Sequence, residues 1–366
     1  MKKTLVAAAL LGAFAGVAQA QTAVQIYGNV DVGVSKRSDQ TVGIGKRAAN
    51  TLGFKGTEDL GNGLKALFQV EMRYEPDTGT TENNGRPLFQ GQSRVGLQGD
   101  FGIVRLGRGL TPFQEIVGSF EPWHGLPTQA GFYTDISVAG FKSAPLDANQ
   151  GSAQGNTDAS VNSNRISNAI FYTSPLSNGF QVSASWATKE GNGGTVTGTG
   201  VGSASYLGTN PQASANPFSI AGTYNNGPFG GMLAYERNAV ESKVWSAAGS
   251  VSLSPELKLM GTVSRQNQNH TNTARPTIKA AELGLTYAMG PGKVLTGFGI
   301  KKQSDEIFQR SLITRQYSLG YEYSLSKRTY LYVDASRKTN WVNQTTGVQN
   351  ATANPNFYDI GLNHSF

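Results

Sequence analysis

The last ten residues of the chain alternate strictly between two kinds of side chain. One face of a strand over 357–366 would carry Tyr358, Ile360, Leu362, His364 and Phe366, and the other Asp359, Gly361, Asn363 and Ser365. A strand of about ten residues with one apolar and one polar face suits a tilted crossing of a lipid bilayer. The polar face needs water, so the pattern predicts a membrane strand that lines an aqueous lumen.

The same alternation recurs along the chain. In 64–74, apolar residues alternate with polar ones that include Lys65, Glu71 and Arg73. A dry core would not accept three such charges unpaired. Counting every segment with this pattern, from 24–35 onward, we predict about sixteen strands, an even number as bacterial barrels require.

The connections between these strands fall into two classes. Short turns such as 58–63 and 100–102 alternate with long polar segments, of which 109–164 is the longest. Short turns on one side and long loops on the other are typical of outer-membrane barrels. Because no water reaches the backbone in hydrocarbon, we expect the sheet to close by pairing its first and last strands. The predicted fold is an all-β transmembrane antiparallel β-barrel.

The first twenty residues have the pattern of an export signal. Lys2 and Lys3 precede an apolar run over 5–17 and a small-residue cleavage site at 18–20. We therefore predict that 1–20 is a cleaved signal peptide and that 21–366 is a single barrel domain.

Composition restricts the remaining classes of function. The chain has no cysteine and a formal net charge of +7, and its basic residues are dispersed among predicted strands, unlike a nucleic-acid-binding stripe. No nucleophile, base and orienting group converge in the pattern, and no metal-ligand spacing occurs. We predict neither enzyme activity nor a cofactor, a metal or a nucleic-acid partner.

Six stretches in order carry a family resemblance: 24–33, 52–66, 93–102, 106–108, 172–175 and 364–366. With them, the chain resembles the trimeric general porins of Gram-negative outer membranes, most closely their β-proteobacterial branch. The resemblance implies sixteen strands, a homotrimer and a third outer loop folded into the lumen opposite a ladder of arginines. It also implies contact with outer-membrane lipid and lipopolysaccharide, and insertion by the barrel-assembly machinery with Phe366 as assembly signal.

The segment 109–164 would be this third loop. Its acidic residues Glu115, Glu121 and Asp135 are the candidates to face the arginines. Its aromatic residues indicate that part of it packs against something, which the resemblance suggests is the inner wall.

Alternation and resemblance together predict which basic residues line the constriction. Arg94 and Arg165 are in the inward phase of their strands, since Val95 and Ile166 take the outward one. Arg108 falls in the outward phase, but the resemblance places it in the pore, and a kink at Gly107 would reconcile the two. The further predicted wall residues are Lys55, Lys65, Glu71, Arg73 and Arg105.

One position departs from the resemblance. Thr51 stands where these porins usually have another arginine, and Glu71 adds a negative charge to the wall. We therefore predict a general diffusion channel for small hydrophilic solutes and ions with a modest anion preference. A substrate-specific channel and a structural or adhesive barrel remain the alternatives.

Overall fold

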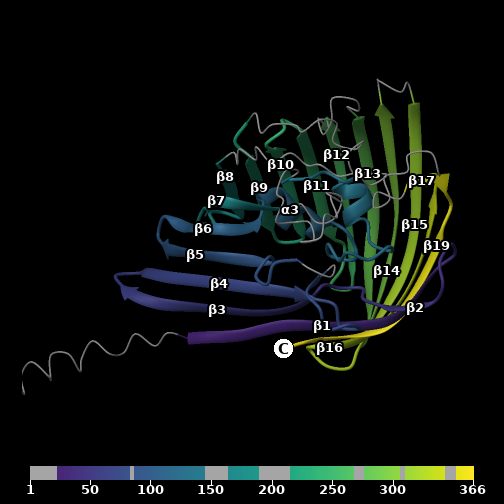
Figure 1. Cartoon of the computed structure of the whole chain (residues 1–366), viewed down its shortest axis with the longest axis horizontal. Coiled ribbons are helices and arrows are strands. Elements are labelled where there is room, and N and C mark those ends of the chain that lie inside the picture. Colours follow the sequence, from purple (N-terminus) through teal and green to yellow (C-terminus); the bar gives the residue numbers. More distant parts are fainter. Residues whose placement is uncertain are drawn as a thin grey trace, which may run out of the picture.

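The structure, a computed structural model, describes residues 23–82, 86–144, 164–188, 215–267, 276–305, 310–342 and 352–366. Within them, sixteen strands form a closed antiparallel sheet to which one short strand is added (Figure 1). The predicted fold class and strand number are confirmed. The predicted signal peptide over 1–20 lies outside the described residues. None of the described helices has the length and apolar character required to cross a membrane.

The strands follow one another around the barrel in sequence order. The first eight are β1 (Ala23–Arg37), β3 (Asn50–Gly61), β4 (Leu64–Tyr74), β5 (Gln92–Gly99), β6 (Gly102–Leu110), β7 (Arg165–Thr173), β8 (Phe180–Ala187) and β9 (Phe218–Asn226). The next eight are β10 (Phe229–Arg237), β11 (Lys243–Ser252), β12 (Leu257–Asn267), β13 (Pro276–Met289), β14 (Gly292–Asp305), β15 (Arg310–Ser324), β16 (Thr329–Thr339) and β19 (Asn356–Ser365). Outside the barrel sheet, β17 (Trp341–Val342) pairs with β18 (Thr352–Ala353).

The first and last strands close the sheet, as predicted. β1 pairs with β3 from Ala23 to Asn29 and with β19 from Asn29 to Arg37. The short strand β2 (Gly43–Gly45) also pairs with β1. In Figure 1 the purple strand β1 runs beside the yellow strand β19 at this seam. Closure pairs the edge groups of both strands, which hydrocarbon would otherwise leave unsatisfied.

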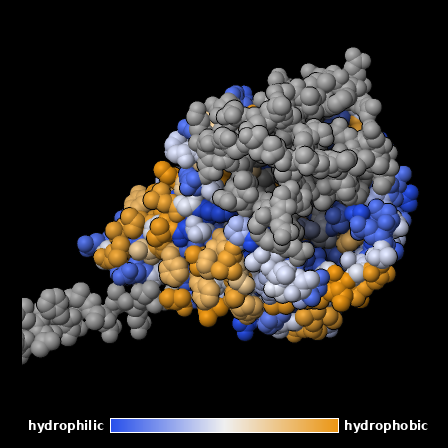
Figure 2. Space-filling view, in the orientation of Figure 1, coloured by the Kyte–Doolittle hydropathy of each residue, from blue (hydrophilic) through white to orange (hydrophobic). Residues whose placement is uncertain are grey.

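The two faces of the sheet differ in character. Large apolar side chains are exposed on one face, where Leu233 is 71% exposed and Ile26 is 58% exposed. Figure 2 shows such apolar residues gathered over the lower left part of the molecule and along its lower edge. The alternate residues are polar and often buried, among them Asp31, Ser246 and Asp359. This is the arrangement of a barrel that is apolar outside and polar inside.

Two details differ from the sequence prediction. β3 continues through 58–61, where we predicted a turn, because Glu58, Asp59 and Gly61 still pair with β4. Only Asn62 and Gly63 form the turn, with positive φ angles of 52° and 78°. The second difference lies in β7, where Asn168 adopts a φ of 51°. One additional residue there shifts the register, and Ile166 is buried instead of facing outward.

The described part of the segment between β6 and β7 folds back onto the polar face of the sheet. It contains α3 (Pro112–Val117), the 3-10 turn η1 (Gly118–Phe120) and the π-helical turn η2 (Tyr133–Ser137). Its apolar side chains form two clusters with the wall. One joins Phe113, Val117, Phe120, Val138 and Phe141 to β9, β10 and β11; the other joins Trp123, Ala130, Phe132, Ile136 and Ala139 to β13 and β14.

Candidate functional site

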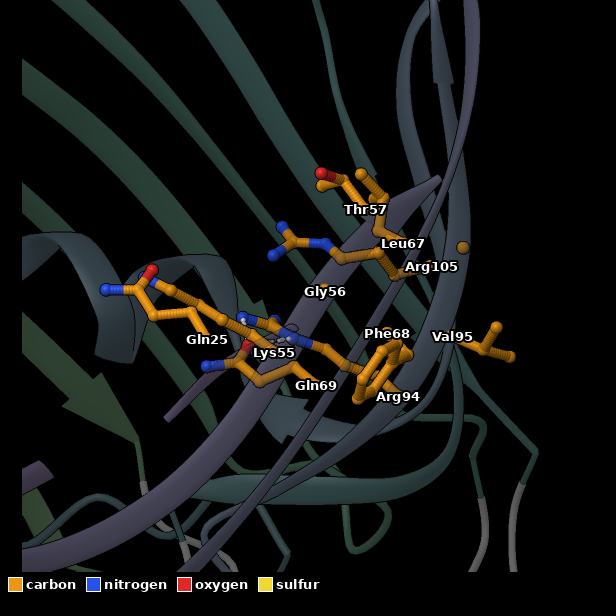
Figure 3. Close-up of a pocket in the computed structure, with 11 residues that line it drawn as sticks. Gln25, Lys55, Gly56, Thr57, Leu67, Phe68, Gln69, Arg94, Val95 and Arg105 are labelled. Carbon is orange, nitrogen blue, oxygen red and sulfur yellow. Dashed lines mark hydrogen bonds between the residues drawn. The ribbon is translucent and has the colours of Figure 1, made fainter. Parts of the chain in front are cut away.

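A recess of about 320 Å³ lies on the polar face of β1 and β3 to β6. Three basic side chains line it: Lys55, Arg94 and Arg105. Figure 3 shows them together with the amides Gln25 and Gln69. Each of the five comes from a different strand, since β1, β3, β4, β5 and β6 contribute one residue each.

Register explains why these side chains meet. Lys55 pairs with Gln69, and Gln69 pairs with Arg94, so the three form a row across β3, β4 and β5. Because paired residues of antiparallel strands point to the same face, the whole row shares the polar side. Arg105, in phase with this row, lies on β6 opposite Gly96.

None of the three cations forms an ion pair within the described part of the chain. Arg94 donates from Nε and Nη2 to Gln69 Oε1 at 3.0 and 2.9 Å. Arg105 donates to Thr173 Oγ1 at 3.4 Å, and Lys55 Nζ lies 5.1 Å from the centroid of the Tyr27 ring. The recess therefore carries three positive charges, and the side chains that bear them contact neutral groups.

The three predicted loop acids occupy different environments. Glu115, on α3, is exposed and interacts electrostatically with Arg94. Glu121 is fully buried and accepts backbone N–H groups of Trp123, Gly125 and Phe132. Burial raises the pKa of Glu121 to about 7, although these hydrogen bonds act in the opposite direction. Glu121 thus organises the loop itself.

Asp135 is also buried and serves to attach the loop. Its carboxylate forms an ion pair with Lys338 on β16. Of the three acids, only Glu115 presents its charge to water.

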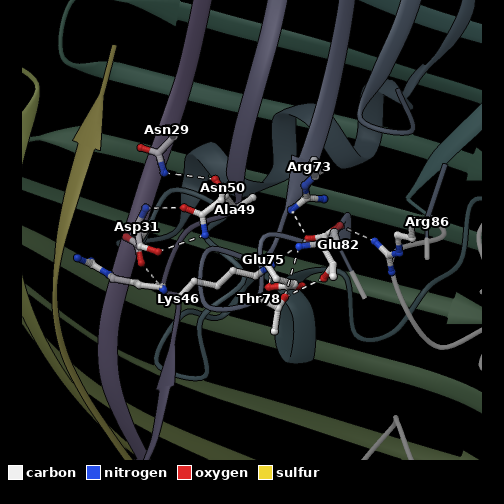
Figure 4. Close-up of polar contacts among 12 residues, drawn as sticks. Asn29, Asp31, Lys46, Ala49, Asn50, Arg73, Glu75, Thr78, Glu82 and Arg86 are labelled. Carbon is white, nitrogen blue, oxygen red and sulfur yellow. Dashed lines mark hydrogen bonds and ion pairs between the residues drawn. The ribbon is translucent and has the colours of Figure 1, made fainter. Parts of the chain in front are cut away.

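A second charged cluster surrounds Glu82, between β4 and β5 (Figure 4). Its carboxylate lies 2.6 Å from Arg86, 3.1 Å from Arg73 and 3.4 Å from Lys46. Burial alone would raise the pKa of Glu82, but the three neighbouring cations outweigh it and lower that pKa to about 2. Glu82 is therefore an ionised carboxylate that neutralises basic residues of the wall.

Arg108 and Arg165 hold the backbone that follows this cluster. Arg108 Nε donates to the carbonyl of Gln90 at 3.0 Å, and Arg165 Nε donates to the carbonyl of Gly91 at 2.6 Å. Neither residue lines the recess around Arg94. Of the three predicted constriction arginines, only Arg94 lines the recess, and Arg108 and Arg165 bond to neighbouring backbone carbonyls.

The predicted kink at Gly107 has a different consequence from the one expected. Gly107 has a φ of 129°, and the register with β7 shifts between Gly107 and Gly109. The additional residue lies in β7, however, and the pairing of β6 with β5 stays regular, with Arg108 opposite Ser93. Arg108 consequently keeps the phase of Leu106, and its guanidinium also donates to Ser167.

Thr51 has a basic neighbour in the structure. Arg73 pairs with Thr51 in register, so a guanidinium lies beside the position where the resemblance places an arginine. That guanidinium is engaged by Glu82 and is nearly buried. Arg73 therefore restores a cation at this level but not a free one.

Sequence reasoning missed Arg47, which precedes β3. Its side chain is fully buried, with Nη2 2.6 Å from Glu322 and Nε 3.0 Å from Asp334. Its guanidinium also lies over the ring of Tyr332 at 4.8 Å. Both carboxylates are more than 270 residues away in sequence. No local pattern distinguishes such an arginine from one in an exposed loop.

The remaining predicted residues do not line the recess. Lys65 is exposed near the β3–β4 turn. Glu71 accepts a hydrogen bond from Tyr27. Phe366 exchanges two backbone hydrogen bonds with Gly28, both of 3.1 Å, at the closing seam.

The comparisons with known proteins agree with this architecture. The Gram-negative porin family matches residues 7–341. The chain belongs to the Gram-negative porin family. An outer membrane porin protein of Bordetella pertussis is 26% identical over the full length of both chains, and outer membrane porin protein 32 of Delftia acidovorans is 29% identical, likewise over both full lengths.

Solved structures share the fold of this porin. The structure of an anion-selective porin from Comamonas acidovorans has a TM-score of 0.73 at 24% identity, covering 94% of this chain and all of that one. A trimer form of OmpT from Vibrio cholerae has a TM-score of 0.67 at 12% identity, covering 94% of this chain and 99% of that chain. The protein is thus an outer-membrane porin with a closed barrel, and its family is one of channels.

Proposed function

We propose that this porin is a general diffusion channel that passes small hydrophilic solutes and prefers anions. The observation that carries the preference is the basic row, formed by Lys55, Arg94 and Arg105, none of which forms an ion pair with a described acidic residue. Fixed charges at a narrow part of a pore act on every passing ion, whereas charges in a wide vestibule are screened within about 8 Å at physiological salt. The similarly folded anion-selective porin from Comamonas acidovorans supports the proposed anion preference.

The third loop narrows the channel in this proposal. Supporting it, the described part of the loop packs on the polar face of β9 to β14, and the charge of Glu115 on α3 interacts with that of Arg94 across from it. A solute would then pass between the basic row and α3. Size selection follows from the gap that the loop leaves, and charge selection from the basic row.

General diffusion is favoured over a channel specific for one solute. A sugar-specific channel needs aromatic rings free to stack on the solute. The loop residues Trp123 and Phe132 are instead buried against the wall, at 1% and 0% exposure. Their role is to attach the loop.

The assembly proposed for this porin is a homotrimer in outer-membrane lipid and lipopolysaccharide, inserted by the barrel-assembly machinery. The trimer form of the similarly folded OmpT supports the trimeric state. The apolar outer face provides the surface for both lipid and subunit contacts.

Planar-bilayer recording tests the proposed function. With a tenfold KCl gradient, we expect a reversal potential of the sign set by chloride, and a preference that weakens as salt shortens the Debye length from about 30 Å at 0.01 M to about 3 Å at 1 M. Cation preference would overturn the assignment of the basic row. Absence of conductance would favour a structural barrel, and saturating flux of one solute a specific channel.

A further inference from the structure

A chain of hydrogen bonds connects the central cation of the recess to a carboxylate of the wall. Arg94 donates twice to Gln69 Oε1, and Gln69 Nε2 donates to the Tyr27 hydroxyl at 2.7 Å. That hydroxyl donates in turn to Glu71 Oε2 at 3.0 Å. Arg94 and Glu71, whose charges have opposite sign, are thus joined through two neutral side chains and not directly.

Backbone geometry holds Tyr27 in this place. Tyr27 pairs with Gly53 on β3, and Gly53 pairs with Glu71 on β4. A Cβ atom at Gly53 would lie 2.4 Å from the Tyr27 ring, so the missing side chain is what allows the ring to cross β3. The hydroxyl therefore reaches β4 between Gln69 and Glu71.

Neither Arg94 nor Glu71, the two ends of this series of hydrogen bonds, forms an ion pair among the described residues. Arg94 forms no ion pair there, and its buried Nη1 has no hydrogen-bond partner. Among the described residues, the Glu71 carboxylate accepts a hydrogen bond only from Tyr27, although its charge interacts with that of Arg94. A carboxylate and a guanidinium so close would be expected to form a direct, charge-assisted pair if both were free to move.

We propose that Tyr27 and Gln69 are positioning residues that hold Glu71 away from Arg94 and thereby set the strength of the anion preference. The inference rests on the proposed function. By occupying both groups with neutral partners, the two side chains leave the charge of Arg94 available to a passing anion. Without them, Glu71 would pair with Arg94 and cancel one of the three charges of the basic row.

The Tyr27→Phe variant tests this inference directly, because it keeps the ring over Gly53 and removes only the hydroxyl. We expect the anion-to-cation permeability ratio to fall roughly twofold, the effect of cancelling one of three nearby cations. Gln69→Met, which fills the same space without a hydrogen bond to Arg94, should lower the ratio in the same way if Tyr27→Phe does not fold.

A double variant that also neutralises Glu71 distinguishes the proposed role of Tyr27 from a purely structural one. In a Tyr27→Phe, Glu71→Gln double variant the neutral side chain cannot cancel Arg94, so the ratio should return to the wild-type value or exceed it. A purely structural role of Tyr27 predicts instead that the loss persists in the double variant. Tyr172→Phe is the matched control, because it removes a hydroxyl that bonds to the Phe101 carbonyl outside the recess.

The outcomes separate the two levels of the proposal. A wild-type channel without anion preference would refute the proposed function itself. A wild-type preference that Tyr27→Phe leaves unchanged, or that the added Glu71→Gln substitution does not restore in the double variant, would refute only the positioning role of Tyr27 and Gln69.

Discussion

At the scale of single residues, this porin separates two uses of basic side chains. Arg47, Arg73 and Lys338 are buried against carboxylates and stabilise the fold. Lys55, Arg94 and Arg105 have neutral partners among the described residues. Net charge does not distinguish the two groups, because only unneutralised charge beside the path of the solute acts on an ion.

Arg94→Ala tests this distinction. Removing one of three cations should lower the anion-to-cation permeability ratio roughly twofold, since the local potential scales with the number of nearby charges. Lys65→Ala, which removes an exposed charge near the β3–β4 turn, is the matched control and should leave the ratio nearly unchanged. Equal effects of the two variants in reversal-potential measurements would contradict the role of the recess.

Glu82→Gln tests the buried cluster between β4 and β5. Removing the partner of the two buried arginines, Arg73 and Arg86, should destabilise the folded barrel by about 3–5 kcal/mol near neutral pH. Because the pKa of Glu82 is lowered to about 2, wild-type Glu82 contributes its stability above about pH 4.5 and loses it as the pH falls toward 2.

The variant and the wild type should therefore converge in acid. Thermal unfolding of both proteins between pH 7 and pH 2 measures the difference. A difference that stays constant over this range would show that ionisation of Glu82 is not its source.

At the scale of elements, glycine residues make room for the third loop on the wall. Phe132 and Ile136 lie over Gly299 of β14, where an added Cβ would come within 2.8 Å of the Phe132 ring and 2.9 Å of Ile136. Gln316 of β15 also donates to the loop carbonyls of Ala130 and Gly131. The loop is consequently attached to the wall by specific side-chain contacts and hydrogen bonds.

Gly299→Ala should therefore displace the segment around Phe132. Overpacking at such a site costs roughly 1–3 kcal/mol, and a loop lifted from the wall changes the cross-section of the pore. We expect an altered single-channel conductance with the barrel intact. Gly222→Ala is the control, since nothing lies within 4 Å of the added Cβ and conductance should remain that of the wild type.

At the scale of the whole molecule, closure depends on the seam between β1 and β19. Phe366 continues the pairing beyond β19 through two hydrogen bonds with Gly28. Asp31 of β1 reinforces the same seam by accepting hydrogen bonds from Tyr332 and Asn363. Both termini of the barrel must therefore be in register before the backbone is fully satisfied.

Gly28→Ala tests this closure. The added Cβ would lie 2.4 Å from both the Phe366 ring and the Thr51 carbonyl oxygen, and the latter is backbone that cannot easily move. We expect a reduced yield of folded barrel, as we also expect after removal of Phe366. Heat-modifiable migration on gels measures that yield, and wild-type amounts from both variants would contradict the importance of the seam.

The sequence alone was sufficient to predict the strands, which face of each strand meets lipid or water, and the closure of the sheet. Alternation with period two assigns each side chain of a strand to water or lipid, as Lys55 and Phe54 illustrate. Backbone hydrogen bonding in hydrocarbon then requires a closed barrel. The same reasoning failed where the period breaks, as at Ile166 beside the additional residue of β7, because a single inserted residue reverses the face.

Only the tertiary structure decided which charges are neutralised. Arg47 meets Glu322 and Asp334, and Tyr27 meets Gln69 and Glu71, through pairings that join residues far apart in the chain. Periodicity tells which side a residue faces but not which neighbour it meets there, because that depends on strand register and on how the loop packs. The strength of an ion preference depends on those neighbours, since a charge is available to a solute only where no fixed partner cancels it.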